Sequence, residues 1–369
     1  MRNIILFFAV VISAIHSCSE SEVNPYWGDG VEFIEIYEDP EIFSDSEGFK
    51  RNGWGGNIML ALDGTVLTDR RSEDGGKTWG EKILHLAGDG RVLDAATGDI
   101  INLHSGYQPE PLPVQYRSRD HGKTWYEEKV IREKDINGWI PITSACEEGI
   151  TLRYGKHKGR LLMAARVMVE YASARDLYEQ HYSSAIYSDD SGGTWHASAP
   201  FPVAGTGEAA LVELSDGRIY YNSRNHNRQG NRSIAWSYDG GETWQDHKEC
   251  SYLPDGPPDF YGNKGGLVRL ELDNYDILIF SMTDDPGGSS DRHTTAGREN
   301  ITVWASFDGG KTWPVKRWVH ERGGYSHLAA GRPGTSSEGM IYLTTSSLYA
   351  RFNLAWITQG RDWREFLTK

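Results

Sequence analysis

Three Gly-Lys-Thr triplets are the first residues in this sequence whose types and spacing could do chemistry. In a phosphate-binding loop, such a triplet follows another glycine that stands five positions before its own glycine, so that backbone N–H groups surround the phosphates. Arg71, Arg117 and Ala305 occupy that position in the three copies. The triplets therefore do not form phosphate-binding loops.

The three cysteines, Cys18, Cys146 and Cys250, lack the Cys-x-x-Cys spacing of a zinc site. In an oxidising compartment Cys146 and Cys250 could pair, and two free buried thiols are the alternative. The chain also lacks a dinucleotide fingerprint and an EF-hand loop. We therefore expect no metal and no other cofactor.

An eight-residue pattern, Ser-x-Asp-x-Gly-x-Thr-Trp, contains these triplets and indicates the elements that position the rest of the chain. It occurs five times, at residues 72–79, 118–125, 188–195, 237–244 and 306–313. Its chemistry is that of a turn, because Asp accepts hydrogen bonds from nearby backbone N–H groups and Gly permits positive φ. Trp then buries a large ring against a neighbouring sheet. Copies 46 to 70 residues apart are typical of one four-stranded propeller blade plus loops.

Composition agrees with one large repeat protein made of short strands. The 369 residues include 42 Gly, 13 Trp and 19 Tyr, and 38% of them are hydrophobic. The formal net charge of −14 argues against a nucleic-acid partner, which requires a basic surface to neutralise phosphates. Abundant aromatic residues argue against disorder.

The N-terminus is typical of an exported protein. A basic start and an apolar run at residues 4–15 precede Ser17 and Cys18, which predicts a signal peptide over residues 1–17. The run is too short to span a bilayer comfortably. Cys18 resembles the lipidated cysteine of a bacterial lipobox, and ordinary cleavage nearby is the alternative. We expect an acidic tether over residues 18–30, a membrane link only through that lipid, and a place in the periplasm or on the outer-membrane surface.

The five repeats resemble the Asp boxes of the sialidase (neuraminidase) superfamily, and the resemblance covers residues 48–356. It implies an all-β fold, a six-bladed β-propeller over residues 31–369 with five Asp boxes and one degenerate blade. The Asp boxes are then structural and lie away from the active face. Residues 31–37 alternate apolar and acidic side chains, so this strand could complete the last blade near residues 350–357 and close the ring.

Two further segments resemble sialidase motifs that carry the catalytic pair. Residues 205–214 resemble the segment with the catalytic Glu, which places Glu208. Glu213 points the other way on an alternating strand, so we expect it to be structural. Residues 324–328 resemble the loop with the catalytic Tyr, which places Tyr325.

Two other segments resemble those that carry arginines of the substrate clamp. Residues 220–225 place Arg224, and residues 297–303 place Arg298. Arginine forks bind a carboxylate through charge-assisted bidentate hydrogen bonds. In sialic acid the carboxylate is attached to the anomeric carbon, where it would repel an anionic nucleophile but not a neutral phenol. The resemblance therefore implies a Tyr nucleophile whose proton is removed by Glu.

Three elements of the family are absent. The Arg-Ile-Pro segment that supplies the first clamp arginine is missing, and Arg51 is the nearest replacement. The loop that carries the acid/base Asp is also missing, which leaves Asp69 as its replacement. His104, His226, His293 and His327 are other possible proton donors. The strand at residues 339–346 lacks the Glu that supports the first arginine.

We therefore expect an exported, monomeric glycoside hydrolase of the sialidase type that acts on an acidic glycan. Two alternatives keep the propeller. One is a hydrolase or lyase that uses the arginines to bind a uronate in a polysaccharide. The other is a carbohydrate-binding propeller without activity.

Overall fold

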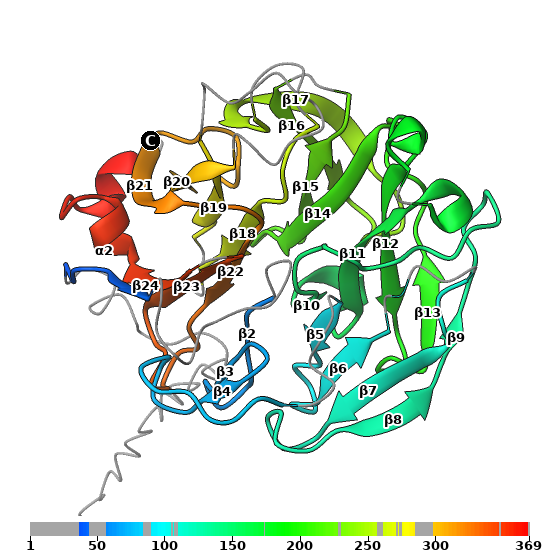
Figure 1. Ribbon diagram of the computed structural model, residues 1–369, viewed down its shortest axis with the longest axis horizontal. Helices are drawn as coiled ribbons and strands as arrows, with labels where there is room; N and C mark the ends of the chain where they lie inside the picture. Colours follow the sequence, from blue (N-terminus) through cyan, green and yellow to red (C-terminus); the bar gives the residue numbers. More distant parts are fainter. Residues whose placement is uncertain are drawn as a thin grey trace, which may run out of the picture.

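The computed structural model describes residues 37–43, 57–83, 90–104, 106, 110–172, 174–227, 230–256, 261–270, 272, 275–284, 298–346 and 348–367. The predicted signal peptide over residues 1–17 and the predicted tether over residues 18–30, which begins with Cys18, lie outside these ranges, as do Arg51 and His293. The described residues form six small sheets arranged around a central axis (Figure 1). The predicted six-bladed β-propeller is therefore confirmed.

The first three blades follow the chain. Blade 1 has the strands β2 (Met59–Leu60), β3 (Val66–Leu67) and β4 (Arg71–Ser72). Blade 2 has β5 (Arg91–Leu93), β6 (Ile100–Leu103), β7 (Val114–Ser118) and β8 (Tyr126–Lys129). Blade 3 has β10 (Ile150–Thr151), β11 (Leu161–Val167), β12 (Tyr182–Ser188) and β13 (Thr194–Ala197), and β9 (Ile131–Arg132) adds a parallel edge strand to β13.

The last three blades have four strands each. Blade 4 has β14 (Thr206–Glu213), β15 (Ile219–Asn225), β16 (Asn231–Ser237) and β17 (Gln245–Pro254). Blade 5 has β18 (Gly266–Arg269), β19 (Leu278–Thr283), β20 (Glu299–Ser306) and β21 (Val315–Arg322). Blade 6 has β22 (Ser326–Ala330), β23 (Met340–Thr345), β24 (Tyr349–Asn353) and β1 (Glu41–Phe43). The short helix α2 (Leu354–Ile357) follows β24.

Single helical turns lie between or after the strands. They are the 3₁₀ turns η1 (Gly155–His157), η2 (Val169–Tyr171), η3 (Arg175–Leu177) and η4 (Trp363–Phe366). In the described part of the chain, no helix is long and apolar enough to cross a membrane.

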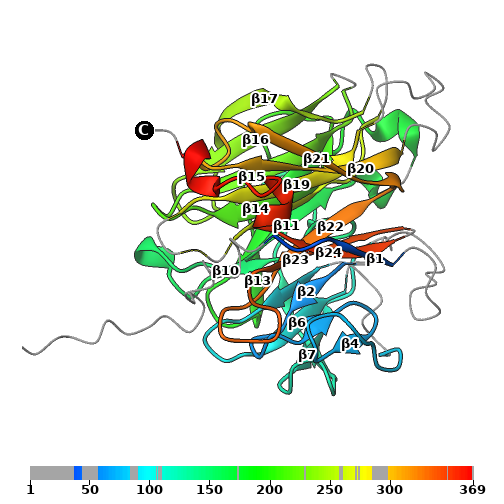
Figure 2. The same cartoon turned by 90° about the vertical axis from the view of Figure 1, so that its left-hand side faces the viewer.

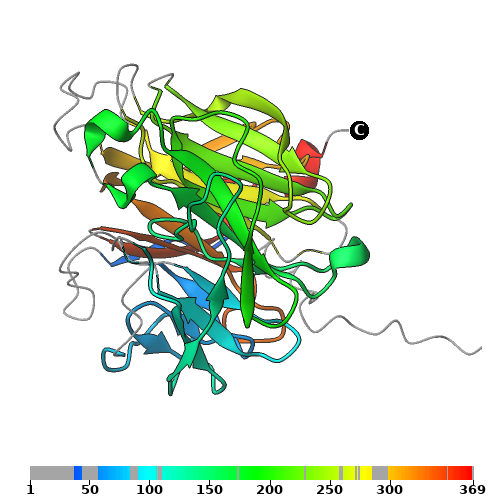
Figure 3. The same cartoon turned by 90° about the vertical axis from the view of Figure 1, so that its right-hand side faces the viewer.

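The ring is closed by an N-terminal strand, but not by the segment that we expected. The antiparallel partner of β24 is β1, whereas residues 31–36 lie outside the described ranges and Tyr37 is not in a strand. Glu41 pairs with Arg351 in the register, and Arg351 Nε donates to Glu41 Oε2 at 2.8 Å. This ion pair holds the closing strand at residues 41–43. Figures 2 and 3 show β1 and the blue first blade beside the last blade.

Each Asp box forms the turn between the third and fourth positions of its blade and is held by its own hydrogen bonds. In the first copy, Asp74 Oδ1 accepts from the backbone N–H of Lys77 and Thr78, and Thr78 Oγ1 donates to Asp74 Oδ2 at 2.6 Å. Gly76 has a φ of +85°, and a Cβ there would collide with the hydroxyl of Tyr349. The box therefore also packs against the preceding blade.

The hydrophobic core is divided among the blade junctions. Six clusters of buried side chains lie among the described residues, and each joins two neighbouring blades. Because both faces of an inner strand pack against other blades, these strands are apolar on both faces rather than alternating. Cys146 and Cys250 lie buried in two different junctions as free thiols, so they do not form a disulfide.

Candidate active site

Glu208 lies at a β-bulge near the start of β14. Thr206 pairs with Asn225 and Ala209 pairs with Ser223, so Gly207 and Glu208 together oppose the single residue Arg224. A bulge of this kind bends the strand and redirects a side chain. Position 207 requires glycine, because a Cβ there would collide with the ring of His226. The bulge brings the carboxylate of Glu208 within 2.6 Å of Arg224 Nη1.

Tyr325 reaches the same carboxylate from blade 6. Its hydroxyl donates to Glu208 Oε1 at 2.9 Å. Tyr325 follows Gly323 and Gly324, and a Cβ on Gly323 would lie 2.7 Å from the carbonyl oxygen of Arg298. The two glycines therefore let the loop pass close to the backbone of Arg298, and they bring Tyr325 to the blade that carries this arginine.

Two arginines lie beside the phenol of Tyr325. Arg224 Nη1 donates to Tyr325 Oη at 2.9 Å, so the hydroxyl lies between a carboxylate and a guanidinium. The guanidinium carbon of Arg298 lies 5.0 Å from the centre of the Tyr325 ring. The structure therefore brings together Glu208, Tyr325, Arg224 and Arg298, the four residues that the motifs indicated.

Arg166 is a site residue that the motifs did not reveal. It lies near the end of β11, is 5% exposed, and places Nη1 3.1 Å from Glu208 Oε1. The signal in the sequence is a single charge within residues 161–167, a run in which every side chain is buried. A charge in such a run needs a partner of opposite sign, but the sequence does not say which residue that partner is.

The electrostatics of the site match a base beside a neutral phenol. Burial opposes ionisation of Glu208, but the charges of Arg224 and Arg166 outweigh it and hold the pKa of Glu208 well below its usual range. Burial and the charge of Glu208 raise the pKa of Tyr325. At neutral pH the phenol therefore keeps its proton, and an ionised carboxylate lies at hydrogen-bond distance to accept it.

The rings of two histidines and a tyrosine pack together beside Glu208. The ring of Tyr178 lies 5.4 Å from that of His181 and 4.7 Å from that of His226. Burial and the charge of Arg166 lower the pKa of His181 to about 4. Burial and the charge of Arg224 hold the pKa of His226 well below its usual range. Both imidazoles are therefore neutral at neutral pH.

Comparison with known proteins identifies the family of this chain. Residues 107–342 match the BNR repeat-like domain family. The sialidase of Micromonospora viridifaciens is 32% identical over 82% of this chain and 50% of its own length. The chain belongs to the sialidase superfamily. The sialidase of Bacteroides fragilis is 28% identical over 70% of the chain and 51% of its own length. This superfamily member thus spans about half the length of these two relatives.

Solved structures of sialidase-superfamily proteins share the fold. The Hadza microbial sialidase Hz136 superimposes with a TM-score of 0.61 at 23% identity, over 82% of this chain and 66% of its own. The intramolecular trans-sialidase of Ruminococcus gnavus also gives a TM-score of 0.61, at 16% identity, over 86% of this chain and 98% of its own. At these identities the likeness supports the propeller alone.

The residues expected to replace the family's missing acid/base do not all lie beside Glu208 and Tyr325, the pair that we call the dyad. Asp69 lies on the turn between β3 and β4, where it contacts Thr68 and Lys82. No hydrogen bond or ion pair within the described residues joins it to Glu208 or Tyr325. Among the histidines, His226 lies beside the dyad, and His104 accepts from the backbone N–H of Gly106 elsewhere.

His327 instead belongs to a buried charged cluster beneath the Tyr325 loop. Lys264 Nζ lies against Glu147 Oε2, 2.6 Å from His327 Nδ1, and donates to the carbonyl oxygen of Ser326 at 2.7 Å. The positive charges of Lys264 and His327 outweigh the effect of burial and lower the pKa of Glu147. These three side chains come from blades 3, 5 and 6 and pack at the centre of the ring.

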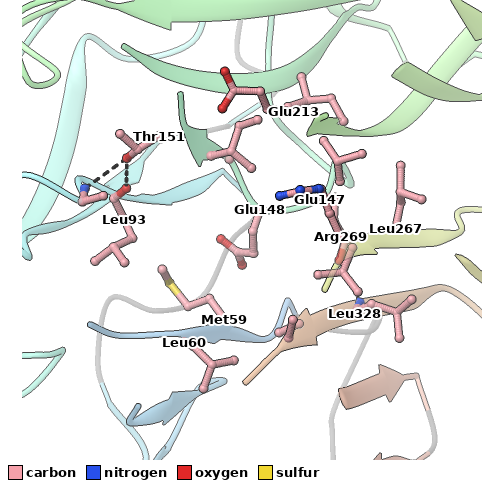
Figure 4. Close-up of a pocket in the computed structure, with 18 of the residues that line it drawn as sticks. Met59, Leu60, Leu93, Glu147, Glu148, Thr151, Glu213, Leu267, Arg269 and Leu328 are labelled. Atoms are coloured by element: carbon pink, nitrogen blue, oxygen red, sulfur yellow. Dashed lines mark hydrogen bonds between the residues drawn. The ribbon is translucent and has the colours of Figure 1, made fainter. Parts of the chain in front are cut away.

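A cavity of about 150 Å³ lies on the propeller axis at the opposite end from the dyad. It is lined by the last residues of β14, β18 and β22, whereas Glu208 is near the first residue of its strand and Tyr325 precedes its own. Figure 4 shows Met59, Leu93 and Leu267 in the lining, together with Glu148 and Glu213. Among the described residues, no group of three or more His, Cys, Asp or Glu side chains is placed to hold a metal ion.

Proposed function

We propose that this chain is a glycoside hydrolase of the sialidase type that releases a terminal acidic sugar from glycans. The observation that carries this proposal is the position of Tyr325 Oη, 2.9 Å from both Glu208 Oε1 and Arg224 Nη1. A phenol in this position can lose its proton to the carboxylate as its oxygen attacks the substrate. The names of the relatives agree with this chemistry.

The first step balances without a cofactor. The proton of Tyr325 passes to Glu208, the phenolic oxygen forms a bond to the anomeric carbon, and the bond to the leaving oxygen breaks. The leaving oxygen takes up a proton from a general acid, for which Asp69 is the candidate, or from solvent water. In the second step water attacks the anomeric carbon and gives up a proton to the same acid/base or to solvent. The bond to Tyr325 then breaks, and Glu208 returns its proton to the phenolic oxygen. Retention of configuration follows from the two displacements.

The charges of the site explain why the substrate is acidic. The protein carries a net charge of −14, so its overall field repels an anion. Arg224 and Arg298 supply a local positive field next to the nucleophile, and a sugar carboxylate on the reacting carbon would lie within it. The same carboxylate would disfavour an Asp or Glu nucleophile, which agrees with a phenol in that role.

The test is hydrolysis of a panel of sialylated and uronate-containing glycans by the wild-type protein and by Tyr325→Phe. We expect release of a terminal acidic sugar by the wild type and loss of that activity in Tyr325→Phe. Tyr238→Phe is the control, because Tyr238 is 52% exposed on blade 4 and contacts Asp246. Full activity of Tyr325→Phe would exclude the tyrosine mechanism.

A uronate-containing polysaccharide is the second candidate substrate, because arginines bind any sugar carboxylate and Asp69 does not contact the dyad. A lyase would leave an unsaturated sugar with ultraviolet absorbance, and a hydrolase would not. Binding of acidic oligosaccharides without any turnover would instead indicate a carbohydrate-binding propeller.

A further inference from the structure

Arg166 contacts the same oxygen of Glu208 that accepts the proton of Tyr325. Its Nη1 lies 3.1 Å from Glu208 Oε1, whereas Arg224 Nη1 pairs with Glu208 Oε2. The backbone of Arg166 is fixed as well, because its N–H and C=O both bond to Ile142 at 2.8 Å. The backbone of Arg166 is therefore held within blade 3, and its guanidinium contacts a carboxylate of blade 4.

The two arginines on Glu208 differ in what else they can bind. Arg224 also donates to Tyr325, and in the proposed function it binds the substrate carboxylate together with Arg298. When that second anion is present, Arg224 shares its charge between two carboxylates. Arg166 pairs with Glu208 Oε1 rather than with the oxygen Oε2 that Arg224 pairs with, and it keeps this pairing when the substrate is bound.

We propose that Arg166 is a positioning residue, which holds Glu208 ionised and aligned on Tyr325 while Arg224 and Arg298 bind the substrate carboxylate. This inference rests on the proposed function. A positive charge beside Glu208 favours its ionised form. Arg166 therefore extends to lower pH the range in which Glu208 can act as the base.

The other groups that face Glu208 do not supply the same effect. Tyr325 approaches from the loop before β22, His181 precedes β12, and His226 follows β15. Burial and the neighbouring arginines lower the pKa of both histidines, so both are uncharged at neutral pH and neither adds a positive charge beside Glu208 there. Since the charge of Arg166 also lowers the pKa of His181, a His181→Gln background separates that titration from the titration of Glu208.

The experiment compares Arg166→Met and Arg166→Lys with Arg160→Met. Arg160 is a matched control, since it is 4% exposed, lies directly before β11, and pairs with the two carboxylates of Asp189 and Glu242 at the other end of the blade. The measurement is kcat and KM against pH on an aryl sialoside, in the wild-type and His181→Gln backgrounds. Thermal unfolding confirms that each variant is folded.

We expect Arg166→Met to lower kcat by about tenfold to a hundredfold, the rate equivalent of one charge-assisted hydrogen bond, with little change in KM. The acid limb of its pH profile moves to higher pH, also in the His181→Gln background. Arg166→Lys restores the acid limb in large part, because it keeps the charge. Arg160→Met lowers the melting temperature and leaves kcat and the acid limb unchanged. If Arg166→Met does not fold, Arg166→Lys replaces it in the test, and we expect a smaller loss of kcat in that variant.

The outcomes separate this inference from the proposed function. If the wild-type protein is active but Arg166→Met behaves like Arg160→Met, the inference fails and the function stands. If Arg166→Met raises KM and leaves kcat and the acid limb unchanged, Arg166 belongs to the substrate clamp and the inference is wrong. If the wild-type protein releases no acidic sugar from any glycan of the panel, the proposed function fails and the inference with it.

Discussion

Glu208 and Arg224 face each other across a β-bulge, and their side chains form an ion pair of 2.6 Å. The extra residue on β14 is what directs the carboxylate of Glu208 toward Tyr325 rather than into a blade junction. The pair is buried, so a substitution that removes one partner would leave the charge of the other uncompensated. The geometry of the base therefore depends on one inserted residue next to a glycine.

Gly207→Ala tests the bulge. The new Cβ would collide with His226, so the strand must shift where it carries Glu208. We expect kcat to fall by about a hundredfold, the cost of a displacement of about 1 Å at a catalytic group. The double variant Gly207→Ala/His226→Ala should recover part of the loss. Gly80→Ala is the control, because Gly80 is exposed and has no atom within 3.4 Å of the new methyl group. An unchanged kcat in Gly207→Ala would contradict this role.

Asp69→Asn tests the acid that protonates the leaving group. The strand order places Asp69 at the same end of the propeller as Glu208. If it is the acid, we expect a loss of about a hundredfold or more on an alkyl-linked sialoside and little change on an aryl sialoside, whose leaving group needs less protonation. Asp63→Asn on the same blade is the control, since Asp63 caps the turn at the other end. Equal effects on both substrates would show that Asp69 has another role.

Lys264→Met tests the buried charged cluster. Lys264 is 0% exposed and pairs with Glu147, which is 2% exposed. We expect a loss of about 3–5 kcal/mol in the free energy of unfolding, because the variant leaves Glu147 buried without its cation. The double variant Lys264→Met/Glu147→Leu should be more stable than Lys264→Met, because it removes the uncompensated charge. Urea unfolding measures both, and a single variant as stable as the wild type would refute the prediction.

We predict that the stability of the folded protein depends on pH through the carboxyl group of Glu213. Burial raises the pKa of Glu213 from 4.5 to about 7, although the backbone N–H groups of Arg153 and Tyr154 act in the opposite direction. The folded state therefore binds this proton more tightly than the unfolded state does, and this group's contribution to stability is present below pH 4.5 and declines as the pH rises to about 7. We expect a flatter plot of melting temperature against pH for Glu213→Gln than for the wild type between pH 5 and 8. Parallel plots for the two proteins would count against the raised pKa.

We predict that a lipid on Cys18 links the protein to the membrane. We expect the wild-type protein to fractionate with membranes when it is produced with its N-terminus in a bacterium that lipidates exported proteins. Cys18→Ala should be soluble after export, and mass spectrometry should find lipid on Cys18 only in the wild type. Cleavage elsewhere, with an unmodified Cys18, would replace the lipoprotein interpretation with that of an ordinary signal peptide.

The propeller could be predicted from the sequence because its repeats are local. Each Asp box completes its hydrogen bonds within eight residues, as Asp308 does with Ser306 and Thr312. Five copies of one turn therefore indicate five blades before any long-range contact is known. The first-strand position was harder to predict, because the short strand β1 is held by its partner Arg351 and not by its own pattern.

The sequence by itself determined the blade repeat, through turns that are encoded locally, and it indicated Glu208, Arg224, Arg298 and Tyr325 through their motifs. Only the tertiary structure decided how these residues meet. The hydroxyl of Tyr325 reaches Glu208 across 117 residues of chain and Arg224 across 101. Arg166 and the cluster around Lys264 have no local pattern, because a buried charge is specified by the partner that ring closure brings to it from another blade.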